Sequence, residues 1–406
     1  MNAVRPLRLA IVTSHPIQYN APAFRALAAE PGLDVRVFYE WEGPGRTIDP
    51  GFGHAVTWDV PLLDGYAHVF IPNVAREPGS HHFRGIDNPA LVEEIRAWSP
   101  DVLLVYGWAF VSHLRVLRAF HRRVPILFRG DSTLVDHRRP GVAVARRALL
   151  RWVYRHVDVA LYAGTLNRAY YRACGVGERR LVWAPHAVDN ARFSADAILR
   201  EAEARAWRAR LGIDDGDTVF LFAGKLMDAK EPATLLRAFV GVRRESTGRA
   251  VHLVFAGEGE QSASLRERAA GRTDVHFLGF QNQAAMPTVY RIGDVLVLPS
   301  RSETWGLAVN EAMACGRASI VSDRVGCGLD LIRSGTTGFV FEHGKPKSLE
   351  SAMSKIIGDR GLPAKMGRNA LAQTDKWSIP AYARAVTAAA RSLVGRADTT
   401  RKALSD

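Results

Sequence analysis

The sequence predicts an α/β protein of two doubly wound domains, each a parallel sheet with helices on both faces. Three observations lead to this fold class. The chain has 406 residues, which is too long for one ordinary hydrophobic core. Short β-branched runs alternate with helical patterns, as the crossover connections between parallel strands require. Around residues 190–215 the alternation stops and then restarts, which indicates a domain boundary.

The first half contains six predicted strands with helical segments between them. We expect the strands at Arg8–Thr13, Asp34–Tyr39, Asp101–Tyr106, Pro125–Phe128, Val157–Tyr162 and Leu181–Trp183. Helical patterns at Ala21–Ala29, Leu91–Trp98 and Leu114–His121 fall between these strands. The order of elements is that of a parallel sheet, whose ligands bind beyond the carboxyl ends of the strands.

The second half repeats the same rhythm after a break. The helical stretch Ile198–Leu211 and the turn Asp214–Asp217 are interpreted as a linker. Strands are then expected at Thr218–Phe222, Val251–Ala256, Val275–Leu278, Asp294–Leu298, Ala318–Ser322 and Gly338–Phe341. The predicted divisions are a first domain over 1–190, a linker over 191–217, a second domain over 218–376, a last helix over 377–394 and a frayed polar tail over 395–406.

The composition narrows the class of partner. The formal net charge is +13, which favours anionic partners, but no helix-turn-helix, zinc-finger or RNA-binding signature is present, so nucleic acid is not expected. Three cysteines without a CxxC pair argue against a disulfide framework or a cysteine zinc site. With no stretch of about 20 apolar residues, we expect a cytoplasmic protein whose membrane contact is at most peripheral.

The segment Ser300–Glu311 carries the strongest chemical pattern. Glu303 and Glu311 bracket Gly306, which stands at the turn into a predicted helix, Leu307–Cys315. A helix N-terminus offers unpaired N–H groups and a positive dipole end, which suit a diphosphate. A carboxylate within the helix can accept bonds from adjacent ribose hydroxyls, and one in the preceding loop can hold a second sugar. Glu311 alone would more simply be a surface acid, but the whole segment indicates a sugar nucleotide.

Two lysines follow the first strand of the second domain. Lys225 comes directly after Gly224, and Lys230 opens the next helix. Two such cations can neutralise a diphosphate without a metal and stabilise charge on a departing group. Gly224 permits close backbone approach. The run Ala256–Gly259 after the next strand is a further glycine-rich turn, which by itself is weak support.

Residues 218–375 resemble the nucleotide-binding half of the family 4 glycosyltransferases, which have the GT-B fold. The resemblance rests on an ordered set of motifs: Gly224-Lys225, Lys230, Gly257-Glu258-Gly259, Leu278-Gly279-Phe280, Glu303-x7-Glu311 with Gly306, Gly326-Cys327-Gly328 and Gly335-Thr336-Thr337-Gly338-Phe339. Pro185–Asp189, followed by Arg192-Phe193, resembles the motif that the family has in its linker. The chain also resembles the family at its end, with Trp377 followed by the predicted helix Ile379–Leu393. The resemblance implies two Rossmann-like domains facing a central cleft, with the last helix crossing back to the first domain.

The resemblance also implies an activity and a donor site. It implies transfer of a sugar from a nucleotide diphosphate, with retention and without a metal or other cofactor. The ribose would lie on Glu311, the transferred sugar on Glu303, and the diphosphate on the two lysines. The expected donor-binding residues are Gly224, Lys225, Lys230, Gly257, Gly279, Phe280, Glu303, Thr304, Gly306, Leu307 and Glu311. Lys225 replaces the commoner arginine, which keeps the charge but loses bidentate geometry, and Asp330 stands where glutamate is usual.

The first domain matches the family less closely. The run Ser14–Pro22 resembles a subgroup of polysaccharide-assembly enzymes with a Ser-His-Pro-Ile-Gln-Tyr loop. Many members place a histidine after the strand that matches Pro125–Phe128, where this chain has Asp131. Asp131 is therefore a catalytic candidate, as a contact to the donor sugar or a base for the acceptor hydroxyl, and His137 is the second candidate.

Acceptor residues are sought among aromatic and histidine side chains of the first domain. Trp41, Trp58 and Trp108 could stack on sugars or simply fill the core, and His15 could reach the cleft or be structural. The acceptor candidates are His15, Trp41, Trp108 and His137. The arginine-rich stretch Ala143–His156 is either a basic amphipathic helix for an anionic membrane or a crossover helix with solvated arginines.

These patterns favour sugar transfer over other nucleotide chemistry. A dinucleotide-dependent dehydrogenase would show Gly-x-Gly-x-x-Gly after its first strand, and Thr13–Asn20 contains no glycine. No P-loop is present. We expect a glycosyltransferase that acts on a glycan or glycolipid acceptor in cell-surface polysaccharide assembly. The alternatives are a catalytically impaired, nucleotide-sugar-binding partner subunit and a nucleotide-sugar epimerase of the same fold.

Overall fold

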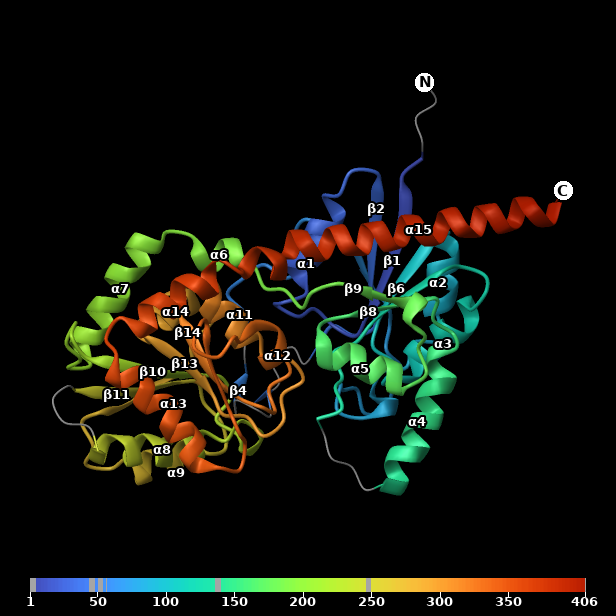
Figure 1. Ribbon diagram of the computed structural model, residues 1–406. Helices are drawn as coiled ribbons and strands as arrows, with labels where there is room; N and C mark the ends of the chain where they lie inside the picture. The colour runs from blue at the N-terminus through green and yellow to red at the C-terminus, as the bar shows by residue number, and fades with distance from the viewer. Residues whose placement is uncertain are drawn as a thin grey trace. The chain divides into compact units, whose positions relative to one another are not determined.

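The computed structural model describes residues 5–43, 48–49, 54–55, 57–135, 140–245 and 250–405. The chain divides into two compact units (Figure 1). Unit 1 comprises Met1–Gly45, Pro61–His186 and Ile379–Asp406, and unit 2 comprises Arg46–Val60 and Ala187–Ser378. Each unit is built on a parallel sheet with helices around it, which confirms the predicted class of two Rossmann-like domains.

The sheet of unit 1 has seven parallel strands in the order β5-β2-β1-β6-β7-β8-β9. Their bounds are β1 Leu7–Thr13, β2 Leu33–Tyr39, β5 Ala67–Phe70, β6 Val102–Tyr106, β7 Ile126–Arg129, β8 Val159–Tyr162 and β9 Leu181–Trp183. The helices are α1 Ala21–Ala28, α2 Leu91–Trp98, α3 Val111–Phe120, α4 Pro140–Tyr154, α5 Thr165–Ala173 and α15 Ile379–Ser405. The short edge strand β5 is the one that the sequence did not predict. The strand order reverses between β1 and β6, which makes their carboxyl ends the topological switch point.

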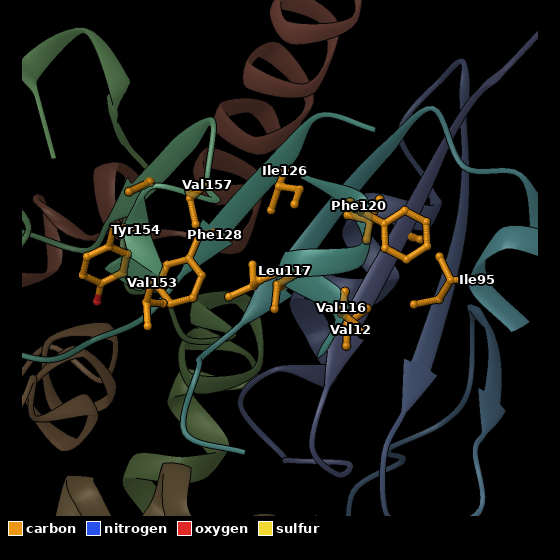
Figure 2. Close-up of a cluster of buried hydrophobic side chains, with 14 of the residues drawn as sticks. Val12, Ile95, Val116, Leu117, Phe120, Ile126, Phe128, Val153, Tyr154 and Val157 are labelled. Carbon is orange, nitrogen blue, oxygen red and sulfur yellow. The ribbon is translucent and has the colours of Figure 1, made fainter. Parts of the chain in front are cut away.

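The core of unit 1 lies between the sheet and its helices. Figure 2 shows Phe128 of β7 among side chains of the neighbouring helices, including Leu117 of α3 and Val153 of α4. All three are fully buried. Burying one such side chain stabilises the fold by about 1.5–3 kcal/mol. The apolar runs that predicted the strands therefore determine the positions of the strand ends. They also determine where the loops after those ends begin.

Helix α15 packs on α1 in unit 1. Its buried residues Tyr382, Val386 and Ala390 face the unit, and the Tyr382 hydroxyl is hydrogen-bonded to that of Tyr106. The helix continues to Ser405, beyond the predicted end at residue 394. No proline follows residue 380 to stop the helix, and the single Gly395 is tolerated within it.

The sheet of unit 2 has six parallel strands in the order β12-β11-β10-β13-β14-β15. Their bounds are β10 Thr218–Ala223, β11 Val251–Ala256, β12 Val275–Gly279, β13 Val295–Leu298, β14 Ala318–Ser322 and β15 Gly338–Phe341. The helices are α6 Asn190–Ser194, α7 Ala197–Arg210, α8 Pro232–Glu245, α9 Ser262–Arg268, α10 Met286–Ile292, α11 Leu307–Ala314, α12 Gly328–Leu331, α13 Pro346–Gly358 and α14 Leu362–Leu371. The switch point of this sheet lies between β10 and β13.

Two segments join unit 2 that the sequence assigned elsewhere. Residues 191–217, expected as a linker, contribute α6 and α7, and α7 packs on α10. There Arg208 is 8% exposed and donates to the Ile292 carbonyl at 2.7 Å and to Asp294 at 2.9 Å. Arg46–Val60, expected in the first domain, also belongs to unit 2. A sequence break marks where a pattern stops but not which sheet the intervening residues pack against.

Candidate active site

Lys230 and Glu303 meet at the switch point of unit 2. Lys230 ends the 3₁₀ turn Asp228–Lys230 after β10, and Glu303 lies in the loop after the neighbouring strand β13. The Lys230 ammonium and the Glu303 carboxylate form an ion pair, with the side chains 25% and 16% exposed. Two predicted catalytic residues, 73 positions apart in the sequence, therefore lie in direct contact.

The Glu303 loop is held by the loop after β14. The Glu303 N–H donates to the Arg324 carbonyl at 3.3 Å, and the Gly326 N–H donates to the Glu303 carbonyl at 3.0 Å. A Cβ atom on Gly326 would lie 1.9 Å from the Thr304 carbonyl oxygen. The Gly326-Cys327-Gly328 motif thus permits two backbone segments to touch, which fixes the backbone of Glu303.

Gly306 makes the turn from that loop into α11. Its φ is +100°, and a Cβ atom there would lie 2.9 Å from Val325 Cγ1, so only glycine fits without strain. The turn is braced by buried Trp305, whose indole Nε1 donates to Asn310 Oδ1 at 2.8 Å. The first N–H groups of α11, starting at Leu307, therefore follow directly on the Glu303 loop and its exposed residue Thr304.

Glu311 lies one turn into α11 and is half-buried. The Tyr290 hydroxyl donates to Glu311 Oε2 at 2.6 Å. Burial raises the pKa of Glu311 to about 7, while the Tyr290 hydrogen bond and the nearby Arg192 charge act in the opposite direction. Arg192 is itself held by Gln283, through its carbonyl at 2.6 Å and its side-chain oxygen at 2.9 Å. Glu311 thus has an organised surrounding, which its sequence position alone did not show.

The loops after β10, β11 and β12 are joined by backbone hydrogen bonds at glycines. The Gly224 N–H donates to Ala256 O at 3.0 Å, and the Gly257 N–H donates to Gly279 O at 2.8 Å. Gly257 has a φ of +141°, and a Cβ atom on it would lie 1.9 Å from Gly224 O. Lys225, half-buried, follows directly on this junction. Three motifs of the predicted donor site, Gly224-Lys225, Gly257 and Gly279, are therefore joined by backbone contacts.

Phe280 begins the loop after β12 and contacts Trp58. The two ring centroids are 6.5 Å apart with an interplanar angle of 53°. Both residues belong to unit 2, and both side chains are half-buried. The structure thus places Trp58, predicted as an acceptor residue, against the loop after β12.

In unit 1, two acceptor candidates lie at the switch point. His15 follows β1, and its ring lies 5.6 Å, centroid to centroid, from Trp41. Burial lowers the pKa of His15, and its Nδ1 lies 3.0 Å from the Ser14 hydroxyl. Trp108 follows β6 and packs partly buried against the core cluster. His137 lies outside the described residues.

Asp131 is exposed and follows β7. It interacts electrostatically with His186, which the sequence analysis assigned only to the linker motif. Burial lowers the pKa of His186 to about 3, with the Arg129 charge adding to this and Asp131 opposing it. Buried Arg129 donates to the carbonyls of Ala184 at 2.5 Å and Pro185 at 3.2 Å. Arg129, the last residue of β7, therefore ties the end of this strand to the residues before His186. An arginine that continues the apolar run Ile126–Phe128 is the sequence signal that could have indicated this link.

Helix α4 has a core face and a basic face. Leu150, Val153 and Tyr154 are buried in the core of unit 1. On the other side Arg147 and Arg151 are exposed, together with Leu149 at 44% and Trp152 at 37%, and exposed Arg155 follows directly after the helix. No helix among the described residues is long and apolar enough to cross a membrane. Within the same residues, no three His, Cys, Asp or Glu side chains come together as a metal site.

Comparison with known proteins identifies the family. Residues 203–373 match the family described as "Glycosyl transferases group 1". The chain is 30% identical over 404 residues to a D-inositol 3-phosphate glycosyltransferase of Nocardia farcinica, with 92% of this chain and 87% of the relative covered. It is 31% identical over 390 residues to the protein of the same name from Rhodococcus erythropolis, with 88% and 85% covered.

A solved structure shares the two-domain architecture. The Anabaena protein HepE, described in complex with UDP and glucose, superposes with a TM-score of 0.70 at 16% identity, covering 95% of this chain and 100% of that one. At this identity the likeness concerns the fold alone, which is the GT-B arrangement of Rossmann-like domains. The matches to full-length relatives extend over both units, and the chain accordingly belongs to the group 1 glycosyltransferases.

Proposed function

We propose that the protein is a retaining, metal-independent glycosyltransferase that moves a sugar from a nucleotide diphosphate donor to a glycan or glycolipid acceptor. The ion pair of Lys230 and Glu303 at the switch point of unit 2 carries this proposal. In an open parallel sheet, that position is where a nucleotide binds. At this position the Lys230 ammonium, which suits a phosphate, is in direct contact with the Glu303 carboxylate, which suits sugar hydroxyls.

The donor would bind across the loops at the carboxyl ends of the strands of unit 2. Its diphosphate would lie on Lys225, Lys230 and the first N–H groups of α11, and the transferred sugar on Glu303. Glu311 would accept bonds from the ribose hydroxyls. The description of Anabaena HepE as a complex with UDP and glucose supports a donor of this class.

The chemistry would break the bond between the anomeric carbon and the diphosphate oxygen and form one to the acceptor oxygen. Negative charge develops on the departing diphosphate, and Lys225 and Lys230 would stabilise it in place of a metal ion. The proton of the acceptor hydroxyl must leave as the new bond forms. Asp131 would take that proton or contact the sugar, with His137 as the second candidate.

The acceptor side of the proposal rests on unit 1. His15, Trp41 and Trp108 stand at or beside its switch point and offer ring faces to a sugar. The exposed arginines and Trp152 of α4 suit an anionic membrane surface, which would bring a lipid-linked acceptor within reach. We therefore propose that the protein acts in polysaccharide assembly at the cytoplasmic face of the membrane. The proposed glycan or glycolipid acceptor differs from the small acceptor in the name of the Nocardia relative.

Thermal stability measured against a panel of nucleotide diphosphate sugars, with and without EDTA, tests the donor class. A ligand at 100 times its dissociation constant stabilises the folded protein by about 2.7 kcal/mol. We expect one selective shift that EDTA does not change. A shift that EDTA abolishes would contradict metal independence, and no shift with any donor would contradict the donor class.

Transfer itself is tested with the donor that binds. Release of the nucleoside diphosphate, with the sugar recovered on a glycan or lipid acceptor of unchanged anomeric configuration, is the expected result. Two alternatives give different products. An epimerase would invert a stereocentre of the donor sugar without an acceptor, and a partner subunit would bind the donor without turnover.

A further inference from the structure

The residue directly after Lys230 has a strained backbone conformation. Glu231 has φ +50° and ψ +46°, in the left-handed region, which side chains other than glycine rarely adopt. It also precedes Pro232, and a proline ring favours an extended conformation in the residue before it. Two steric rules therefore disfavour this conformation. Such strain persists only where the surrounding contacts enforce it, and it is concentrated at functional sites.

The conformation of Glu231 determines how the turn that carries Lys230 ends. Glu231 follows the 3₁₀ turn Asp228–Lys230 and leads into helix α8. Its N–H donates to the Asp228 carbonyl at 3.2 Å, and its carbonyl accepts from the Thr234 N–H at 3.0 Å. Glu231 is thus bonded to both the turn and the helix. A change of its φ and ψ would redirect the backbone at Lys230.

A histidine from the loop after the edge strand β15 holds the Glu231 side chain. His343 Nε2 lies 3.0 Å from Glu231 Oε1. The His343 N–H donates in turn to Asp323 Oδ1 at 3.0 Å. The side chains of His343 and Glu231 are 25% and 22% exposed, so solvent screens their contact only in part. The contact can therefore oppose the backbone strain better than a fully exposed pair would.

The loop after β14 is bonded toward both members of the ion pair of the site. Its Asp323 anchors His343, and the carbonyl of the next residue, Arg324, accepts from the Glu303 N–H at 3.3 Å. Glu303 is thus held directly by this loop, and the turn of Lys230 is held by it through His343. One loop therefore bears on the positions of both charges.

We propose that Glu231 and His343 are positioning residues for Lys230, and that their contact keeps the left-handed turn in place and directs the ammonium toward the departing diphosphate. This inference rests on the proposed function and adds two residues that touch neither donor nor acceptor. Lys230 would stabilise charge that develops only as the bond to the diphosphate breaks. Misplacing Lys230 should therefore impair turnover more than donor binding, because Lys225 and the N–H groups of α11 also bind the donor before the reaction.

The test measures kcat and the donor KM for release of the nucleoside diphosphate by the full-length protein, with the donor that the thermal-stability panel identifies. We expect Glu231→Gly and His343→Ala each to lower kcat about 10- to 100-fold, the effect of misplacing a catalytic group. The donor KM should stay within about threefold of the wild-type value, because ground-state binding is retained. Glycine adopts the left-handed conformation without strain, so Glu231→Gly removes the contact and keeps the fold.

Two further measurements separate positioning from a general loss of structure. Glu231→Gln and His343→Gln can each keep a hydrogen bond between the two positions, so each should recover most of kcat. The double variant Glu231→Gly/His343→Ala should lose no more than either single variant, because both substitutions remove the same contact.

Asp196→Gly is the matched control. Asp196 is an exposed residue of unit 2 with φ +49°, and it precedes α7. The substitution replaces another left-handed residue by glycine outside the site, so kcat and KM should be unchanged.

Full kcat in Glu231→Gly would overturn the inference and leave the proposed function intact. The inference would also be wrong if the donor KM rose while kcat stayed the same, if the two glutamine variants recovered nothing, or if the losses multiplied in the double variant. Should His343→Ala fail to fold, Glu231→Gly and the glutamine variants would decide. A wild-type protein that releases no nucleoside diphosphate from any donor would instead overturn the proposed function, on which the inference depends.

Discussion

The loops at the carboxyl ends of the two sheets are held together by different means. In unit 2, backbone meets backbone at glycines, as where Gly257 and Gly326 touch the carbonyls of Gly224 and Thr304. In unit 1, the close contact of Gly85 with the Gly79 carbonyl lies within one loop, and buried polar side chains join one loop to another. The amide of fully buried Asn88, for example, donates to the carbonyls of Glu40 and Ile71, both at 2.8 Å.

This difference bears on what each unit can do. Backbone contacts at glycines leave little room for variation and present a fixed row of N–H groups, which suits a ligand part common to many donors. Side-chain contacts can be exchanged for others of similar volume, which suits a surface that must be adapted to a particular acceptor. We therefore expect the chemistry common to the reaction to depend most on unit 2.

The largest expected effect is on turnover. Glu303→Gln and Lys230→Ala should each lower kcat about 100- to 1,000-fold, because each removes a preorganised charge from the reacting groups. The melting temperature should stay close to that of the wild type. Lys345→Ala, which removes a 66% exposed lysine paired with Glu342, is the control and should keep full activity. If Asp131→Asn lowered kcat more than either of these variants, the comparison would be reversed. The reaction would then depend more on the residues of unit 1 than on those of unit 2.

The next effect is on stability and concerns the glycine contacts. Gly257→Ala should lower the free energy of unfolding by about 2–4 kcal/mol, because the new methyl group cannot avoid Gly224 O without moving the backbone. Gly271→Ala is the control: its φ is +75°, but a Cβ atom there has no neighbour within 4 Å. It should cost about 1 kcal/mol, the conformational strain alone. Equal losses in urea unfolding would show that the close contact does not constrain the loops.

The same contrast explains which parts of the molecule were predictable. A glycine needed for a backbone contact stands at a fixed place after its strand, so Gly224, Gly257 and Gly306 formed a pattern that pointed to one surface. The β-branched and apolar runs likewise predicted every strand of the seven- and six-stranded sheets except the edge strand β5. They did not predict the separate antiparallel pair of β3 (Ile48–Asp49) and β4 (His54–Ala55).

Side-chain pairs that are distant in the sequence could not be predicted in this way. His186 and Asp131 are 55 positions apart, and Trp58 and Phe280 are 222 positions apart, so no local spacing relates either pair. Their proximity follows from strand order and from the unit in which a loop packs. The sequence therefore indicated Asp131 as a candidate but gave no reason to add His186, and it sought Trp58 among acceptor residues.

A buried contact between a histidine and a carboxylate in unit 1 tests whether side chains hold the loops of that unit. His113 Nε2 lies 3.0 Å from Glu40 Oε2, with the two side chains 2% and 0% exposed. Glu40→Ala should lower the free energy of unfolding by about 3 kcal/mol, because it leaves His113 buried without its partner. The double variant Glu40→Ala/His113→Ala should cost less than the sum of the single variants. Strict additivity in urea unfolding would mean that the pair does not hold the loops.

The smallest expected effect is a pH dependence in unit 2. The pKa of Glu311 is about 7 in the folded protein against an ordinary value of 4.5, so the folded state binds the proton more tightly. The contribution of Glu311 to stability is therefore full below pH 4.5 and declines as the pH rises toward 7. In Glu311→Gln, the free energy of unfolding should decline less over this interval. An unchanged pH profile would show that Glu311 is not perturbed.

Donor binding should follow the opposite course, because only the ionised Glu311 is a full acceptor for the ribose hydroxyls. Affinity for the nucleoside diphosphate should increase as the pH rises through about 7. Tyr290→Phe removes a hydrogen bond that stabilises the ionised carboxylate, so it should shift the midpoint of this increase to higher pH. Tyr382→Phe, which removes a hydroxyl from the tyrosine pair of unit 1, should leave the midpoint unchanged. If Tyr382→Phe moved the midpoint as far as Tyr290→Phe, the titrating group would not be Glu311, and donor binding would depend on unit 1 as much as on unit 2.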